Sequence, residues 1–317
     1  MSLLDRLAPW TTTGVGSLPH TDAAQAAAHA AAAYELPFCP QLPALDGDMI
    51  SEWLGADPRR CGWSPDRDRE RPRAWDHWLA QLARVPPPHG IVKLQVTGPA
   101  TLACALERTA SPRPSRTGSL RLATQIAAWL AANAAGQVAA LRERGLDAVL
   151  IVDEPALGVY GAEGVEAVWD PLRAVAPVWG LHLCCPVDWA LVDRARPDVL
   201  SFDLAVSPVD DAAATALGRL ADRGGRVIWG VVRPHMPEHA HHGLLRLSAT
   251  RDLVAHAQCL ISPACGSGRM AVRREHELAT AVADVARTMR QTSDRRRRPR
   301  STRRVGEEPA IARFQAP

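Results

Sequence analysis

The sequence predicts an α/β protein that folds as a single closed barrel of eight parallel strands, a (β/α)8 or TIM barrel. Two observations lead to this fold class. Short runs rich in β-branched residues alternate with longer runs rich in alanine and leucine, and such alternation is typical of a parallel sheet. About eight of these units fit into roughly 280 residues, a length that suits a closed barrel of this kind.

The expected strands are short and apolar, and the segments between them are long enough to hold helices. In chain order they are Thr11–Val15, Cys39–Leu42, Ile91–Val96, Ala148–Val152, Val178–Leu183, Val199–Phe202, Val227–Val232 and Gln258–Ile261. An open doubly wound sheet is the alternative. It is disfavoured because no glycine-rich phosphate loop follows the first strand, where Thr13–Gly16 is too sparse in glycine.

Alanine- and leucine-rich runs between the strands predict the helices Ala23–Tyr34, Leu120–Arg144, Val165–Val175, Trp189–Ala195, Asp211–Arg223, Leu244–His256 and Glu275–Arg290. Two charged segments are expected to lie outside the barrel. Asp57–Arg73 reads as a long loop after the second strand, and Arg295–Arg304 opens a basic tail that should be disordered. We therefore place one catalytic domain at residues 1–292 and a disordered arginine-rich tail at 293–317.

The composition argues against several classes of protein. The formal net charge is only +3 and much of the basic excess lies in the tail, which disfavours a nucleic-acid-binding surface spread over the fold. Seven cysteines cannot all pair within the chain, so a reducing compartment fits better than a disulfide scaffold. No signal-peptide core and no run of about 18 strongly apolar residues is present. We expect a cytoplasmic protein without membrane or specific nucleic-acid partners.

Three soft side chains that are far apart in the sequence indicate a zinc site. His182 and Cys184 close the fifth strand, and Cys265 follows the eighth. Zinc binds imidazole and thiolate ligands, and in a barrel the residues that follow the strands share one rim. Asp203, at the end of the sixth strand, is either the fourth ligand or a hydrogen-bond partner of the ligand histidine. The alternative for the cysteines is a buried pair beside a core histidine.

Other polar residues follow strands and would meet at the same rim. Asp153 and Glu154 are either a cluster at a helix start, where carboxylates complement the helix dipole, or a clamp for an ammonium or hydroxyl group. Ser17 and His235 follow the first and seventh strands. The remaining thiols and imidazoles are expected in structural or solvated positions: Cys185, Cys39, Cys61, Cys104, Cys259, His239, His241 and His242.

Six motifs in a characteristic order make the chain resemble the catalytic C-terminal barrel of cobalamin-independent methionine synthase, within the wider group that includes uroporphyrinogen decarboxylase. The motifs are Thr11–Pro19, Asp48-Met49 with Glu52–Gly55, Val96–Leu102, Val152–Leu157, His182–Cys184 and Pro263–Gly266. Each is weak alone, and it is their order that makes the resemblance specific. They extend through nearly all of the part that is expected to fold.

The resemblance implies a zinc-dependent methyltransferase that methylates a thiol, most simply homocysteine to give methionine. It implies that His182, Cys184 and Cys265 hold zinc. Asp203 stands where the family has a glutamate ligand that is one methylene longer, so direct ligation is an open question.

The resemblance also assigns the substrate contacts. Ser17, with backbone N–H groups near Gly16, would bind the amino-acid carboxylate, and Glu52 and Asp153 would bind the amino group. His235 would be the proton-donating acid and, with Asp153, a catalytic residue. Arg233, which is close to His235 in the sequence, stands where the family has an acidic residue.

The methyl donor stays open between methyltetrahydrofolate and a methylcorrinoid. The family's full-length form carries an N-terminal barrel that helps to bind the folate, and this chain has no room for one. That favours a corrinoid donor, with a corrinoid methyl-carrier protein as a candidate partner. Two alternative functions are a uroporphyrinogen-decarboxylase-like enzyme, which the zinc motifs disfavour, and a non-enzymatic protein that handles zinc or corrinoids.

Overall fold

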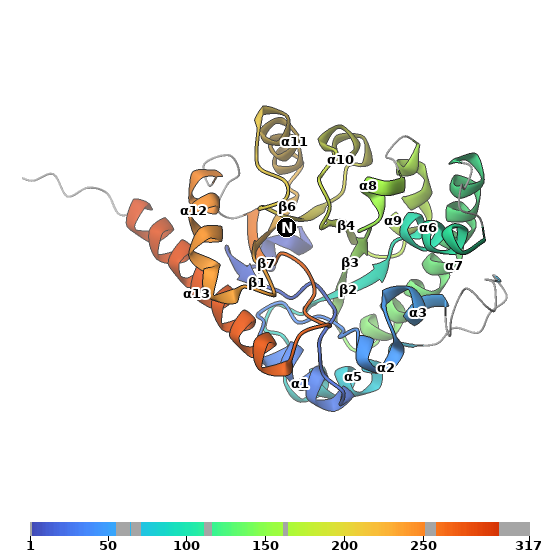
Figure 1. The fold of residues 1–317 in the computed structure, drawn as a ribbon. Helices are drawn as coiled ribbons and strands as arrows, with labels where there is room; N and C mark the ends of the chain where they lie inside the picture. The colour runs from blue at the N-terminus through green and yellow to red at the C-terminus, as the bar shows by residue number, and fades with distance from the viewer. Residues whose placement is uncertain are drawn as a thin grey trace, which may run out of the picture.

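Seven parallel strands form one sheet at the centre of the molecule, and helices surround it (Figure 1). The computed structural model describes residues 2–54, 64, 71–110, 116–160, 164–250 and 258–297. Along the sheet the strands follow the order β1-β7-β6-β5-β4-β3-β2. Their bounds are Thr11–Thr12 (β1), Ile91–Thr97 (β2), Asp147–Asp153 (β3), Val178–Leu183 (β4), Val199–Asp203 (β5), Arg226–Val232 (β6) and Cys259–Pro263 (β7).

The segment 36–41 lies between the two edge strands of this sheet. Phe38 forms a parallel bridge to Lys93 of β2, and Gln41 forms one to Ser17, which follows β1. The strand expected at Cys39–Leu42 is therefore an extended, hydrogen-bonded segment instead of a regular strand. Pro37 and Pro40 explain the difference, because proline has no N–H to donate to a ladder. Within the described residues, seven regular strands replace the expected eight.

The other expected strands are present with shifted ends. β4 has the expected bounds, while β1 is shorter than expected. All residues of β2, β4, β5, β6 and β7 are buried, as is usual for a parallel sheet that is covered on both faces.

The helices include most of those that the sequence predicts. They are α1 (Ala23–Ala32), α2 (Pro43–Asp46), α3 (Met49–Leu54), α5 (Trp75–Arg84), α6 (Pro99–Ala110), α7 (Arg116–Arg142), α8 (Leu157–Tyr160), α9 (Asp170–Arg173), α10 (Trp189–Ala195), α11 (Asp211–Asp222), α12 (Ala240–Thr250) and α13 (Val272–Arg297). Helices α2, α3, α5, α6 and α8 were not expected. The helix expected at Val165–Val175 is divided into a 3-10 turn (η2, Val165–Trp169) and α9, which has Pro171 in its first turn.

Two charged segments fall largely outside the described residues. These are most of the loop expected at Asp57–Arg73 and, in the tail, residues 298–317. Helix α13 continues through the expected domain end at residue 292 to Arg297. None of the described helices combines the length and the hydropathy needed to cross a membrane.

Two separate apolar clusters cover the two faces of the sheet. The larger cluster joins the strands to the surrounding helices. The smaller one fills the inner face near the beginnings of the strands, where the 3-10 helix η1 (Leu3–Arg6) packs against it. Its members are Leu4, Leu7, Leu36, Ile91, Val149, Ile151, Val178, Val199, Ile228 and Leu260. Because side chains alternate along a strand, residues two and four positions further on share this inner face.

Candidate functional site

Polar side chains replace apolar ones on the inner face toward the carboxyl ends of the strands. The strand register places Thr97 opposite Asp153, Asp153 opposite His182, and His182 opposite Ser201. All four side chains are buried. We call Thr97, Asp153, His182 and Ser201 the inner polar row. It lies at the end of the strands where barrel enzymes carry their reacting groups.

His182 is held in one orientation by a neighbouring hydroxyl. Its Nδ1 lies 2.9 Å from Ser201 Oγ, and its Nε2 is buried without a hydrogen-bond partner. Asp203 directs Oδ1 to the backbone N–H of Ala205, 2.7 Å away, in its own turn. The hydrogen-bond partner of His182 is therefore Ser201, a residue that the sequence did not single out. The buried Nε2 is the atom of this ring that remains for a ligand.

Cys265 lies near both of the other predicted zinc ligands, Cys184 and His182. The proximity of Cys184 and His182 holds the pKa of Cys265 below its usual range, and the proximity of Cys265 together with burial raises the pKa of Cys184. Cys265 is exposed and Cys184 half-buried, so the pair can be reached from solvent.

This donor set fits a zinc ion in its chemistry. One imidazole with a buried, unpaired nitrogen and two adjacent sulfurs are ligands that zinc prefers. Binding would require the thiols to lose their protons and turn from each other to the metal. Among the His, Cys, Asp and Glu side chains of the described residues, one group of three has donor atoms that all lie within 4.8 Å of one another. That group is His20, His29 and His276, not the predicted zinc ligands.

Asp153 and Glu154 are neighbours with different surroundings. Glu154 accepts hydrogen bonds from the Ala100 N–H (3.1 Å), the Thr101 N–H (2.8 Å) and hydroxyl (2.7 Å), and the Trp169 indole (2.9 Å). It therefore anchors the start of α6, which matches the helix-start alternative for this carboxylate. Asp153 instead keeps a buried Oδ1 without a partner, in the inner polar row.

Burial raises the pKa of Asp153 to about 6, while His182 and Lys93 oppose the rise. A carboxylate that is buried and incompletely hydrogen-bonded is costly for the fold. Such a group is therefore available for a bound ammonium.

Ser17 lies against the loop that carries Cys265. The backbone N–H of Ser267 donates to the Ser17 carbonyl at 3.0 Å, and the Gly268 N–H to the Ser17 hydroxyl at 3.4 Å. A side chain at Gly266 would collide with Ser17 Oγ, which explains the glycine after Cys265. The predicted carboxylate site and the predicted zinc ligand are thus on adjoining segments.

Glu52 is connected to the same region through Gln41. Gln41 Nε2 donates to Glu52 Oε2 at 2.7 Å, and the Gln41 backbone N–H donates to the Gly16 carbonyl at 3.1 Å. Helix α3, which carries Glu52, is held to the inner polar row by a 3.0 Å bond from Thr97 Oγ1 to the Met49 carbonyl.

His235 lies apart from these contacts. It is exposed in the turn that follows β6, and so is Arg233. His239, His241 and His242 are also exposed, on a 3-10 turn and the start of α12 instead of a loop. No hydrogen bond joins His235 to the inner polar row within the described part of the chain.

Lys93 is a buried polar residue of the interior that was not among the predicted site residues. Its Nζ donates to the Val15 carbonyl at 2.6 Å and to Gln95 Oε1 at 3.0 Å. Burial lowers its pKa to about 8, and the negative charge of Asp153 opposes this effect. The sequence alone could have drawn attention to this residue, because Lys93 is the only lysine and every other Lys or Arg position holds an arginine.

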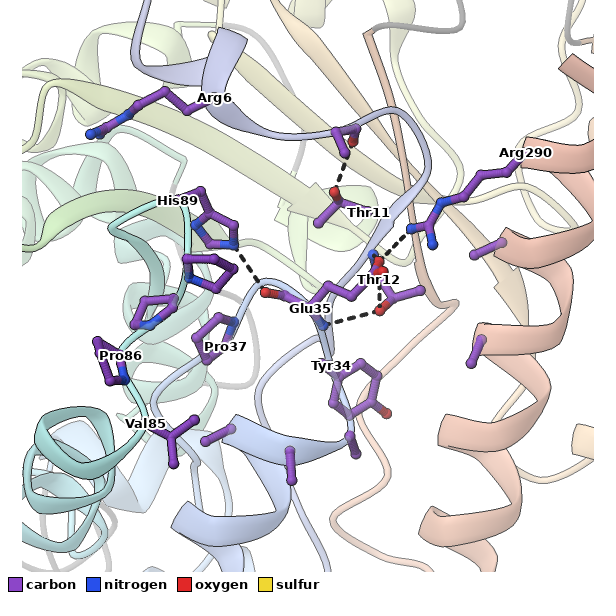
Figure 2. Close-up of a pocket in the computed structure, with 18 residues that line it drawn as sticks. Arg6, Thr11, Thr12, Tyr34, Glu35, Pro37, Val85, Pro86, His89 and Arg290 are labelled. Atoms are coloured by element: carbon purple, nitrogen blue, oxygen red, sulfur yellow. Dashed lines mark hydrogen bonds and ion pairs between the residues drawn. The ribbon is translucent and has the colours of Figure 1, made fainter. Parts of the chain in front are cut away.

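A cavity of about 610 Å³ opens at the other end of the strands (Figure 2). It is lined by segments that precede strands, including Tyr34, Glu35 and His89. Glu35 accepts a 2.9 Å bond from the Thr12 N–H and forms an ion pair with Arg290, which ties α13 to this end. None of the predicted ligand or substrate residues lines the cavity, so we place the candidate site at the inner polar row.

The solved structures that share this fold include three with TM-scores above 0.5. A B12-independent methionine synthase from Shewanella sp. W3-18-1, in complex with selenomethionine, gives a TM-score of 0.53 at 16% identity over 72% of this chain and 70% of that one. The chain shares the fold of B12-independent methionine synthases. A protein from Listeria monocytogenes, proposed to be such an enzyme, gives 0.57 at 13% identity over 89% of this chain and 98% of that one.

The third similar structure is a methyltransferase from Methanosarcina mazei, with a TM-score of 0.53 at 14% identity over 89% of this chain and 96% of that one. No protein-family model and no curated protein sequence matches this chain. The resemblance found in the motifs is therefore confirmed at the level of the fold.

Proposed function

We propose that this protein is a zinc-dependent methyltransferase that methylates a thiol, with homocysteine as the acceptor and methionine as the product. The observation that carries the proposal is His182. Its Nδ1 is held by Ser201, its buried Nε2 has no partner, and it adjoins the Cys184–Cys265 pair. The shared fold with B12-independent methionine synthases supports the same conclusion.

His182, Cys184 and Cys265 would hold the metal, with Asp203 as the candidate fourth ligand. A free thiol with a pKa of about 8.5 is mostly protonated at neutral pH, and zinc held here would keep the substrate sulfur ionised and nucleophilic.

The remaining residues would bind and orient the amino acid. Asp153 has a buried carboxylate oxygen available for the substrate ammonium, and Glu52 lies on α3 above the same row. Ser17, with backbone N–H groups near Gly16, would bind the carboxylate. Holding both ends of the amino acid would align its sulfur for attack on the methyl group.

The donor decides whether an acid is needed. Methyl transfer from a folate leaves a nitrogen that must be protonated, whereas a corrinoid cobalt leaves with the electron pair of its methyl bond. Nothing in the described contacts supports a corrinoid over a folate, so the donor and a corrinoid carrier protein stay proposals.

We predict that His235→Ala abolishes turnover with methyltetrahydrofolate and spares turnover with methylcobalamin. The His235 imidazole would be needed only to protonate the nitrogen leaving group of the folate donor. Steady-state rates with the two donors, measured on one preparation, test this role. Equal losses with both donors would contradict it.

The proposal itself is tested by zinc content and methyl transfer measured together. We expect Cys184→Ser and Cys265→Ser to lose the thiolate-bound zinc and the activity while circular dichroism stays unchanged. Cys39→Ser, which changes a buried thiol away from the ligand set, is the matched control and should keep both. A decarboxylase-like function would instead tolerate metal removal, and a storage protein would bind zinc without turning over substrate.

A further inference from the structure

A second group of imidazoles lies outside the candidate site. His20 is in the loop after β1, His29 is on α1, and His276 is near the start of α13. One ring nitrogen of each lies within 4.8 Å of one ring nitrogen of each of the others. Helix α1 and the beginning of α13 lie side by side (Figure 1), so residues from the two ends of the sequence meet here.

The three rings face one another closely. Ring centroids are 5.2 Å apart for His20 and His29, 4.7 Å for His29 and His276, and 6.3 Å for His20 and His276. His20 is 3% exposed, and its Nδ1 is buried without a hydrogen-bond partner. A buried imidazole nitrogen without a partner is costly unless something else binds it.

A buried carboxylate supports the group from behind. Glu275 is 1% exposed, and its Oε1 lies 3.0 Å from His29 Nε2 and accepts a 2.8 Å bond from the Tyr34 hydroxyl. With its Nε2–H directed to this carboxylate, His29 presents Nδ1 as the atom with a free lone pair. A carboxylate that binds the second nitrogen of a histidine is a usual companion of metal-binding imidazoles.

We propose that His20, His29 and His276 bind a divalent transition-metal ion, with zinc as the expected occupant, at a site separate from His182, Cys184 and Cys265. Imidazole nitrogens bound to one tetrahedral zinc ion at about 2.0–2.1 Å lie roughly 3.3 Å apart, so only small side-chain adjustments are needed. His276 is exposed and can make them, and it leaves the fourth position to water.

The ion would join the first helix of the fold to the last. β1 pairs with β7, and α13 follows β7, so the bound metal would clamp α1 and α13 across this junction of the two ends of the sequence. A site that forms only in the folded chain stabilises the fold by its binding free energy.

The experiment measures bound zinc in the full-length protein after equilibration with excess zinc and removal of the free ion. We expect two equivalents in the wild type, one in His276→Gln and two in His242→Gln. His242→Gln is the control, because His242 is an exposed histidine of a different cluster, which consists of His239, His241 and His242. Both substitutions are on the surface and should leave the fold intact. Equal zinc in the wild type and His276→Gln would overturn the proposal.

Cobalt substitution separates this site from the proposed thiolate site. Of the two proposed sites, only the one formed by His182, Cys184 and Cys265 has sulfur ligands that give sulfur-to-cobalt charge-transfer absorption. His276→Gln should therefore keep these bands while losing one cobalt equivalent. In the Cys184→Ser background, zinc should raise the Tm, and adding His276→Gln should abolish that rise. A rise that survives in the double variant would overturn the histidine site. Absent charge-transfer bands in the wild type would count against the proposed function alone.

Discussion

At the scale of single residues, one hydroxyl decides how the candidate zinc ligand is presented. Ser201 Oγ holds Nδ1 of His182, and this leaves Nε2 as the buried nitrogen without a partner. Partners of this kind fix the tautomer and the orientation of a metal-binding imidazole. Without the hydroxyl, the ring could rotate or change its tautomer.

We predict that Ser201→Ala weakens zinc binding by about 10–100-fold, the usual effect of removing such a partner. Competition with a chromophoric chelator measures the affinity. Ser262→Ala is the matched control, because Ser262 is also buried at the end of an inner strand and donates to the Pro263 carbonyl. An unchanged affinity in Ser201→Ala would show that the hydroxyl does not orient the ligand.

At the scale of secondary-structure elements, the two adjacent carboxylates at the end of β3 have different surroundings. Glu154 accepts four hydrogen bonds that tie α6 and the turn carrying Trp169 to the sheet. The glycine at position 98 is required here, because any side chain would collide with the Glu154 carboxylate. Asp153, one residue earlier, belongs to the inner polar row and keeps a buried Oδ1 without a partner.

We predict that Glu154→Gln lowers the free energy of unfolding by about 2–4 kcal/mol, because an amide group would face the donors of α6. Asp153→Asn should not lower it, since it removes a buried charge that the fold stabilises poorly. Urea denaturation measures both. A smaller loss in Glu154→Gln than in Asp153→Asn would reverse the assignment of the two carboxylates.

At the scale of the whole molecule, the inner face of the sheet changes from apolar to polar along the strand direction. The smaller of the two apolar clusters fills the inner face at the beginnings of the strands, and the ends of the strands carry the inner polar row. Lys93 lies between them and brings a positive charge into the interior near Asp153. This gradient concentrates the chemistry at one end of the sheet.

We predict that the wild type gains stability relative to Lys93→Met as the pH rises from about 8 toward 10.5. The folded chain releases the Lys93 proton near pH 8 and the unfolded chain only near 10.5. The unfolded state therefore binds more protons in this window, and the gain is up to about 1.4 kcal/mol per pH unit. Paired denaturation curves at each pH measure the difference. A difference that does not change with pH would contradict the buried, titrating lysine.

Much of the fold could be predicted because its signals are local. Apolar runs of strand length and alanine-rich runs of helix length located all strand positions and most helices. The second strand failed as a regular strand because Pro37 and Pro40 interrupt its hydrogen bonding. Helix α6 was missed because its anchor, Glu154, lies more than fifty residues away in the sequence.

By itself, the sequence determined the alternation of strands and helices and the position of polar residues at strand ends, because both follow from local periodicity. Only the tertiary structure decided that Ser201 partners His182, that Asp153 rather than Glu154 faces inward, and that His20, His29 and His276 meet. These depend on strand register and helix packing between distant segments, which bring together atoms that no local pattern connects.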